Sequence, residues 1–265
     1  MRPFMIAFML DTPLPPPPPP SPDWALFLDV DGSILDFAAT PDAVHVPDGL
    51  VDALGRLSDA LGGALALVSG RPLEQLDALF APLRLPGAGL HGLQVRDDAS
   101  PGAAAIDAPP ALAQLAAQAH AIAAQYPGAL VEDKGCTLAL HWRNAPEAAP
   151  AFHALAANAL ELLPHYRPQP GQQVLELRPD GFDKGGAIRH LMQRAPFAGR
   201  CPVFVGDDLT DEHGFIAVNA LSGLSVIVGD RRPTDATHRL TAPQALRDWL
   251  HAAARSQHPY KEASA

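Results

Sequence analysis

From residue 24 onward, short apolar runs alternate with stretches in which apolar residues recur every three or four positions. A run of four or five apolar residues is typical of a strand buried on both faces, and the recurring spacing is typical of a helix that packs on a sheet. The alternation predicts a parallel sheet with helices on its faces. The expected strands are 24–28, 64–68, 201–205 and 225–228, with a further short strand and turn within 83–92. The expected helices begin near residues 50, 72, 182 and 244.

A second unit interrupts this pattern between about Arg96 and Pro179. Residues 97–110 are rich in Pro, Gly and Ala and indicate a linker into it. We expect a small sheet with two helices on one face, which is the economical packing of the pieces that follow. These pieces are helices around 112–126 and 152–163 and strands at 129–131, 137–142 and 173–177. Because the alternation resumes afterwards, we predict that residues 97–179 are inserted into a domain made of 23–96 and 180–256.

The two ends of the chain differ from the rest in composition. The proline run Pro15–Pro20 cannot donate backbone hydrogen bonds and favours an extended polyproline II conformation. We expect residues 1–22 to form a disordered, proline-rich tail, although the tract could also bind a groove that recognises such ligands. The apolar run at the start is too short for a secretory leader, and Asp11 follows it at once. Residues 257–265 are polar and are expected to fray.

Charge and cysteine content narrow the classes of function. The 265-residue chain has a formal net charge of -10, which argues against a nucleic-acid partner because such a partner requires a basic surface. Cys136 and Cys201 are far apart, so neither a disulfide framework nor a zinc site is expected, and a reducing cytoplasm fits. No apolar stretch is long enough to cross a membrane. We expect a cytoplasmic monomer.

Two carboxylates follow the first predicted strand, where the chain begins to turn. Asp29 and Asp31 stand two positions apart, and Gly32 lets the backbone bend away. One carboxylate could attack phosphorus as a nucleophile, and the other could give and take a proton. Such close carboxylates repel each other, and a divalent cation would relieve that repulsion. The alternative is a strand followed by an ordinary Asx-type turn.

The second predicted strand also ends in groups that suit an anionic ligand. Ser69, Gly70 and Arg71 supply a hydroxyl, a flexible turn and a guanidinium, and Pro72 then begins a helix. Open parallel sheets bind ligands beyond the carboxyl ends of their strands, which is where both motifs lie. Ser69 could equally be a helix cap.

An acidic loop follows the strand at 201–205. It holds three Asp and one Glu in six residues, 207–212, which is costly unless a cation binds there. Mg²⁺ is the natural candidate because it takes hard oxygen ligands and needs few carboxylates, and the spacing excludes an EF-hand for calcium. A solvated acidic turn is the alternative. We expect the ion to be bound by Asp29, Asp207 and the Asp31 carbonyl, with Asp208 or Asp211 in support.

Lys184 comes at the start of the predicted helix near 182. A carboxylate that attacks a phosphate dianion needs a cation to hold both groups, and Lys184 could supply it together with the Ser69 hydroxyl. Lys184 could also be an ordinary surface cation beside a helix cap.

Taken in order, these motifs resemble those of the haloacid dehalogenase superfamily. The carriers are Asp29-Val30-Asp31-Gly32-Ser33, Ser69-Gly70-Arg71, Asp183-Lys184-Gly185 and Gly206-Asp207-Asp208. The resemblance implies a Rossmann-like parallel-sheet core in which Asp29 forms an aspartyl-phosphate and Asp31 is the acid and base. It also implies that Ser69 and Lys184 hold the phosphoryl group and that Asp207 completes the Mg²⁺ site.

A finer resemblance is to the trehalose 6-phosphate phosphatase family. Its carriers are the segments 89–92, 131–135, 140–143, 175–179 and 206–212. It implies an α/β fold in which the insert is a smaller α/β cap for substrate recognition. The implied substrate-binding residues are Glu132, Lys134 and Glu176, with Arg71, His91 and Arg143 as further candidates. The family commonly has Tyr where this chain has Trp142, so we assign Trp142 no polar role.

The resemblance therefore implies a Mg²⁺-dependent phosphatase that acts on trehalose 6-phosphate. One alternative is a phosphatase for another sugar phosphate, such as sucrose phosphate or mannosyl phosphoglycerate. Another is a sugar phosphomutase, which would pass the phosphoryl group to a second sugar hydroxyl. A third is a non-enzymatic scaffold recognised through the polyproline tract.

Overall fold

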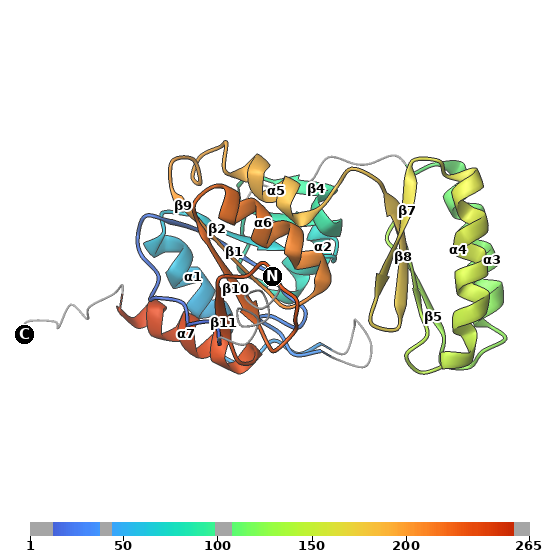
Figure 1. Ribbon diagram of the computed structural model, residues 1–265, viewed down its shortest axis with the longest axis horizontal. Coiled ribbons are helices and arrows are strands. Elements are labelled where there is room, and N and C mark those ends of the chain that lie inside the picture. The colour runs from blue at the N-terminus through green and yellow to red at the C-terminus, as the bar shows by residue number, and fades with distance from the viewer. Residues whose placement is uncertain (1–12, 38–43, 99–107, 257–265) are drawn as a thin grey trace, which may run out of the picture.

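The computed structural model describes residues 13–37, 44–98 and 108–256. Its secondary structure forms two sheets, one of seven strands and one of four (Figure 1). Parts of three predicted segments lie outside the described residues: 1–12 of the tail, 99–107 of the linker and the end at 257–265.

The seven-stranded sheet has the order β11-β10-β9-β1-β2-β3-β4. Neighbouring strands run parallel except β3 and β4, which are antiparallel. β1 lies at the centre of the sheet, and every residue of its apolar run is buried. The strands are β1 (Trp24–Leu28), β2 (Leu65–Val68), β3 (Gly87–Gly89), β4 (Gln94–Arg96), β9 (Cys201–Gly206), β10 (Leu224–Val228) and β11 (His238–Leu240).

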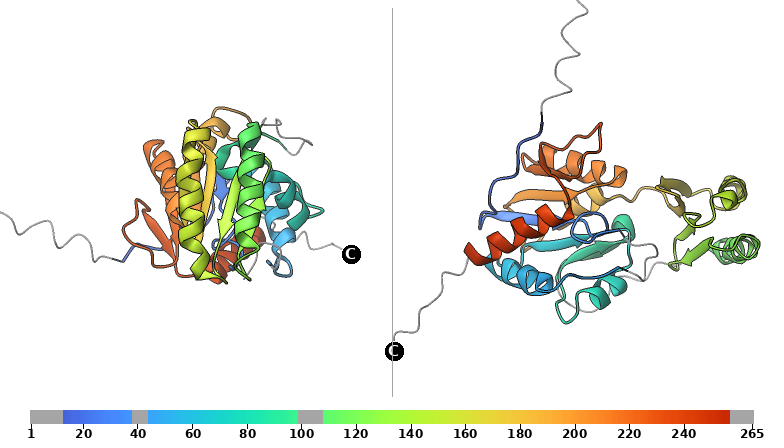
Figure 2. Two further views of the ribbon diagram at one scale, coloured as in Figure 1. Left: turned by 90° about the vertical axis from the view of Figure 1, so that its right-hand side faces the viewer. Right: turned by 90° about the horizontal axis from the view of Figure 1, so that it is seen from below.

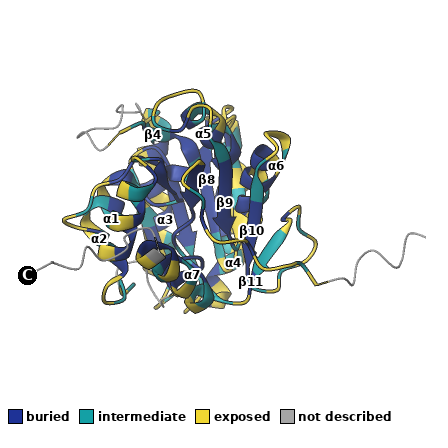
Figure 3. Cartoon of the chain, turned by 90° about the vertical axis from the view of Figure 1, so that its left-hand side faces the viewer, coloured by how far each residue is buried: buried dark blue, intermediate teal, exposed yellow. Residues whose placement is uncertain are grey.

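Helices cover both faces of this sheet. α1 and α7 pack together on one face, and α5 and α6 pack together on the other (Figures 1 and 2). The central strands are buried, the edge strands β4 and β11 are partly exposed, and the helices carry exposed stripes on their outer sides (Figure 3). The helices are α1 (Leu50–Ala60), α2 (Leu73–Leu79), α5 (Lys184–Leu191), α6 (Glu212–Ala220) and α7 (Pro243–Ser256). This arrangement confirms the predicted α/β core.

The four-stranded sheet is antiparallel, with the order β5-β6-β8-β7. Helices α3 and α4 cover its far face, and its open face is turned toward the seven-stranded sheet (Figure 1). The elements are α3 (Pro110–Ala123), β5 (Leu130–Asp133), β6 (Leu138–His141), α4 (Ala149–Leu162), β7 (Tyr166–Gly171) and β8 (Val174–Pro179). The predicted insert with two helices on one face is therefore present, and we call it the cap. Its boundaries at 97 and 179 stay a prediction.

Residues 13–22 differ from the predicted disordered tail, because they lie against the core. Leu14 packs on the hydrophobic core, and the Pro15 carbonyl accepts a hydrogen bond from the Arg239 backbone N–H at 2.9 Å. The indole Nε1 of Trp249 donates to the Pro18 carbonyl at 3.1 Å. Prolines cannot donate backbone hydrogen bonds, but their carbonyls accept them, and the tract uses that capacity here.

Candidate active site

Three neighbouring strands bring the predicted motifs to one edge of the core sheet. β1 pairs in parallel with β2 on one side and with β9 on the other. Asp29, Ser69 and Asp207 each follow the last residue of one of these strands. Because parallel strands end at the same edge, residues that are far apart in sequence meet there.

Lys184 links the end of β1 to the acidic loop that follows β9. It is the first residue of α5 and is 3% exposed. Its Nζ donates to Asp29 Oδ1 at 2.7 Å and to Asp211 Oδ1 at 2.5 Å. Burial lowers the pKa of Lys184, but the charges of Asp211 and Asp29 outweigh burial and hold that pKa above its usual range. The ammonium is therefore charged and fixed between two carboxylates.

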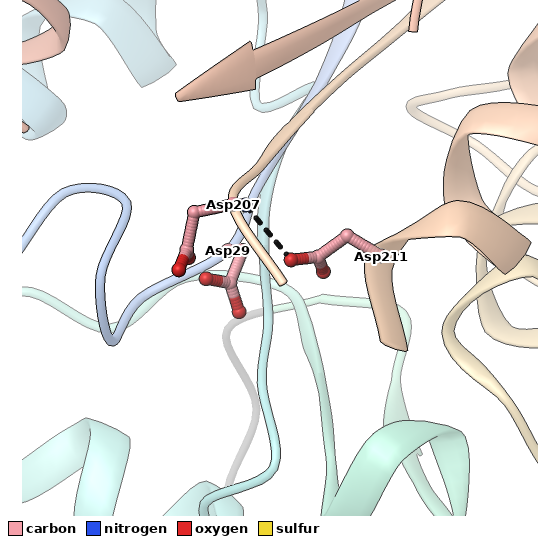
Figure 4. A group of neighbouring side chains, drawn as sticks. All are labelled: Asp29, Asp207 and Asp211. Carbon is pink, nitrogen blue, oxygen red and sulfur yellow. Dashed lines mark hydrogen bonds between the residues drawn. The ribbon is translucent and has the colours of Figure 1, made fainter. Parts of the chain in front are cut away.

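Asp29, Asp207 and Asp211 form a cluster whose nearest carboxylate oxygens lie within 4.8 Å of one another (Figure 4). Burial and the charge of Asp211 raise the pKa of Asp29 to about 7. Burial and the charge of Asp29 raise the pKa of Asp207 to about 9. Lys184 alone does not neutralise this cluster, and three carboxylates with hard oxygen donors fit a divalent cation.

Three further hydrogen bonds and one glycine shape this acidic cluster. The Ser33 hydroxyl donates to Asp207 Oδ1 at 2.9 Å. Asp211 Oδ2 accepts the backbone N–H groups of Asp207 and Asp208, both at 2.9 Å. Gly32 has a φ of +88°, and a side chain there would collide with the Asp207 carboxylate, so the turn after β1 requires glycine.

Asp31 lies apart from the acidic cluster, and its carboxylate pairs with Arg71. Arg71 Nε and Nη2 donate to the two oxygens of Asp31, each at 2.7 Å. The Ser69 hydroxyl oxygen accepts the Arg71 backbone N–H at 3.1 Å, which ties this pair to the end of β2. The carboxylate that sequence reasoning assigned to proton transfer is thus oriented by a bidentate arginine.

The cap contributes a second group of polar residues around Glu176 of β8. Its Oε1 accepts hydrogen bonds from Thr137 Oγ1 at 2.7 Å and Lys134 Nζ at 3.3 Å. Its Oε2 lies 3.1 Å from His91 Nε2 in the core. Burial raises the pKa of Glu176, but the Lys134 charge and the His91 hydrogen bond outweigh burial and hold that pKa well below its usual range. Glu176 is therefore a charged carboxylate although it is buried.

Glu132 of β5 lies beside this group. Its Oε2 is 3.3 Å from His141 Nε2 and 3.9 Å from Lys134 Nζ. Burial raises the pKa of Glu132, while the His141 hydrogen bond and the Lys134 charge bring it below its usual value. The cap thus presents two carboxylates and an ammonium, groups that can bind sugar hydroxyls.

One cavity of about 530 Å³ joins the strand ends to the cap. The predicted residues that line it are Asp29, Asp31, Ser69, Arg71, His91, Glu132, Lys134, Arg143, Glu176, Lys184 and Asp208. Asp207 and Asp211 are not among the residues that line it, although their carboxylates cluster with that of Asp29. The structure thus brings together the residues that the motifs singled out, with those from the core at one end and those from the cap at the other.

Three contributors were not assigned from the sequence: Ser33 as a partner of Asp207, Thr137 as a partner of Glu176, and His141 as a partner of Glu132. The turn between β7 and β8 also lines the cavity, although no motif in the sequence indicates it. A signal existed for His141, because the predicted strands at 129–131 and 137–142 join through a short turn and so must pair.

Comparisons with known proteins agree with this geometry. The family model described as trehalose-phosphatase matches residues 27–244. The chain is 44% identical over 239 residues to the trehalose-6-phosphate phosphatase of Escherichia coli strain K12, which covers 90% of this chain and 89% of that protein. It is 44% identical over 235 residues to a probable trehalose-phosphate phosphatase of Sinorhizobium fredii, and the aligned region covers 88% of this chain and 88% of that protein.

A solved structure of the C-terminal domain of Candida albicans trehalose-6-phosphate phosphatase has the same fold. The TM-score is 0.74 at 20% identity, with 88% of this chain and 92% of that chain covered. The family model and the sequence relatives each cover most of the chain, and both include the strand-end motifs and the cap. This chain belongs to the trehalose-phosphatase family.

Proposed function

We propose that this chain is a Mg²⁺-dependent phosphatase that hydrolyses trehalose 6-phosphate to trehalose and inorganic phosphate. The observation that carries the proposal is the cavity that joins Asp29 and Lys184 at the strand ends to Glu132, Lys134 and Glu176 in the cap. A phosphate at the core end would leave its sugar beside the cap carboxylates. The 44% identity to the Escherichia coli enzyme supports the choice of substrate.

In the first half-reaction, an oxygen of Asp29 attacks phosphorus and the bond from phosphorus to the sugar oxygen breaks. Asp31 gives its proton to that departing oxygen, and Asp29 becomes an aspartyl-phosphate. In the second half-reaction, Asp31 takes a proton from water while the water oxygen attacks phosphorus. Phosphate leaves and the Asp29 carboxylate is restored.

Three residues around these two have defined tasks in this mechanism. Lys184 holds Asp29 in position at 2.7 Å and faces the phosphoryl group with its charge. Ser69 offers its hydroxyl to a phosphate oxygen, and Arg71 orients Asp31. For proton transfer, one Asp31 oxygen must turn from the guanidinium toward the leaving group.

Asp29 and Asp207 would ligate Mg²⁺, together with the Asp31 carbonyl. Their raised pKa values support this assignment, because both carboxylates lack sufficient positive charge around them. Asp211 belongs to the same cluster and would support the site. A bound Mg²⁺ would supply positive charge to the equatorial phosphate oxygens.

A substrate panel tests the proposal. Phosphate release is measured with trehalose 6-phosphate, glucose 6-phosphate and sucrose 6-phosphate, each in Mg²⁺ and then in EDTA. Selective, metal-dependent release from trehalose 6-phosphate is the expected result. Preference for another sugar phosphate would refute the assignment of the cap, and conversion to an isomeric sugar phosphate without phosphate release would indicate a mutase.

We further propose that the protein works as a monomer in the cytoplasm. Within the described ranges, no helix is long and apolar enough to span a membrane. Cys136 and Cys201 are free thiols, which supports a reducing compartment. Size-exclusion chromatography with light scattering tests the oligomeric state.

A further inference from the structure

His91 lies in an unusual stretch of backbone at the edge of the cavity. Leu90 and His91 have φ values of 49° and 54°, in the left-handed region that residues with a side chain seldom adopt. Two hydrogen bonds hold the stretch: Leu90 N–H donates to the Arg71 carbonyl at 3.0 Å, and His91 N–H donates to the Ser69 carbonyl at 2.9 Å. Strain of this kind persists where the surroundings impose it, and it is common at functional sites.

This backbone places the imidazole of His91 directly over Gly70. A Cβ on Gly70 would come within 2.6 Å of His91 Nε2, so the ring occupies the space that a side chain at Gly70 would need. From there, Nε2 lies 3.1 Å from Glu176 Oε2, across the boundary between core and cap. The side chain of His91 is 14% exposed and that of Glu176 is 8% exposed, so water competes little for this contact.

A second contact crosses the same boundary. Lys134 Nζ donates to the Gly70 carbonyl at 3.2 Å as well as to Glu176 Oε1 at 3.3 Å. Glu176 therefore holds Lys134 on one oxygen and meets His91 with the other. Both contacts converge on Gly70 and His91, which belong to the core.

The protonation of His91 suits the role of a donor. Burial lowers the pKa of His91 below its usual value, although Glu176 opposes that shift, and the lowered pKa favours the neutral ring. A neutral ring that donates from Nε2 has a bare acceptor at Nδ1, and Nδ1 is buried with no partner among the described residues. Among the described residues, the ring nitrogens of His91 therefore make one hydrogen bond, and its partner is Glu176.

We propose that His91 is a positioning residue that fixes Glu176, and through it Lys134, so that the cap stays seated on the core with its sugar-binding groups facing Asp29. His91 then acts through Glu176 instead of touching the sugar, which reassigns a residue first predicted to bind substrate. The proposal rests on the proposed function, because it deepens the account of how that site selects a disaccharide phosphate.

The proposal separates two classes of substrate. Binding of a disaccharide phosphate requires the cap groups to be correctly placed relative to the core, so binding depends on His91. A small ester such as p-nitrophenyl phosphate uses only the strand-end residues, so its hydrolysis does not depend on His91. Loss of the His91 contact should raise KM for trehalose 6-phosphate while the turnover of the small ester is kept.

The variant for the test is His91→Asn. Asparagine tolerates the left-handed backbone better than most residues, so the turn is kept, but its amide is too short to reach Glu176. The matched control is His165→Asn, the same change at an exposed position outside the cavity lining. Thermal unfolding of both variants establishes that each is folded.

We expect His91→Asn to raise KM for trehalose 6-phosphate by about tenfold to a hundredfold, the usual effect of losing a hydrogen bond to a charged group. The kcat should fall less than KM rises, and turnover of p-nitrophenyl phosphate should stay within about twofold of the wild-type value. An equal fall in kcat for both substrates would overturn the proposal, because His91 would then act in the core chemistry.

A double-mutant cycle with Glu176→Ala tests the route of the effect. If His91 acts through Glu176, His91→Asn changes KM little once Glu176 is truncated. Additive effects would refute the positioning role and indicate a separate contact between His91 and the sugar.

Hydrogen exchange keeps the two proposals distinguishable. If the wild type hydrolyses p-nitrophenyl phosphate but not trehalose 6-phosphate, the proposed function fails. The positioning role is still decided by amide exchange at residues 133–137, where His91→Asn should speed exchange and His165→Asn should not. Unchanged exchange in His91→Asn would contradict it.

Discussion

Asp211 links the loop after β9 to Lys184, and its replacement by Asn tests how the acidic cluster is held. The side chain is completely buried. One oxygen accepts from Lys184 and the other from two backbone N–H groups, so Asp211 is a partner of three donors. Asparagine keeps the shape but has a single acceptor oxygen, and its amide N–H₂ must face either the ammonium or the two backbone donors.

The magnitude follows from two opposing effects. Breaking a buried charge pair costs about 3–5 kcal/mol because the remaining charge is left uncompensated. Removing the Asp211 charge also relieves its repulsion of Asp29 and Asp207, whose pKa values it raises, and Lys184 keeps Asp29 as a partner. We therefore expect a net loss near the lower end, about 3 kcal/mol, which corresponds to a fall in Tm of roughly 6–12 °C.

Asp208→Asn is the matched control, since Asp208 lies in the same loop and is exposed. Its side chain caps the turn that follows, and Asn caps as well as Asp, so this change should be nearly neutral. Thermal unfolding by calorimetry at pH 7 compares both variants with the wild type. Equal Tm values for Asp211→Asn and Asp208→Asn would refute the reasoning.

Three further predictions concern other parts of the molecule. Removal of Mg²⁺ with EDTA should abolish activity. Readdition of Mg²⁺ at about a hundredfold its Kd should restore activity and raise Tm by roughly 5–10 °C. A Tm that does not change when Mg²⁺ is added would argue against the acidic site. Trp249→Phe should lower stability by about 1 kcal/mol through loss of the bond to Pro18, measured by urea unfolding, and an unchanged midpoint would mean that the proline segment is not held there. The pKa of Glu176 lies below its usual value, so the ionised side chain stabilises the fold above about pH 4.5 and loses that contribution as the pH falls. As the pH is lowered from about 7 to about 3, Tm should therefore drop more steeply in the wild type than in Glu176→Gln. Parallel curves of Tm against pH would contradict this.

The core of the site could be predicted because its residues follow strands. A buried apolar run identifies each strand from sequence alone, and parallel strands end at one edge, so Asp29, Ser69 and Asp207 had to meet. Lys184 could be placed by the same argument, because it begins the helix that follows the insert, where the chain comes back to that edge of the sheet. The role of Asp211 as the organiser of the loop depends on its buried contacts, which spacing does not show.

Other features required the tertiary structure. β7 contains Pro168 and Pro170, which argue against a strand, yet it lies at the edge of its sheet, where missing donors are tolerated. The proline segment docks through Trp249, which is 231 positions from its partner Pro18, so no local pattern could indicate the contact. The pairing of His91 with Glu176 spans 85 positions and depends on how the cap sits on the core.

The measurement that tests the central claim most directly compares wild type and Asp29→Asn on trehalose 6-phosphate in Mg²⁺, with phosphate release followed over time. Asn has nearly the shape of Asp but cannot form the aspartyl-phosphate. The account predicts that the wild type releases phosphate and that Asp29→Asn is slower by roughly a thousandfold or more. Comparable release by the two proteins would contradict it.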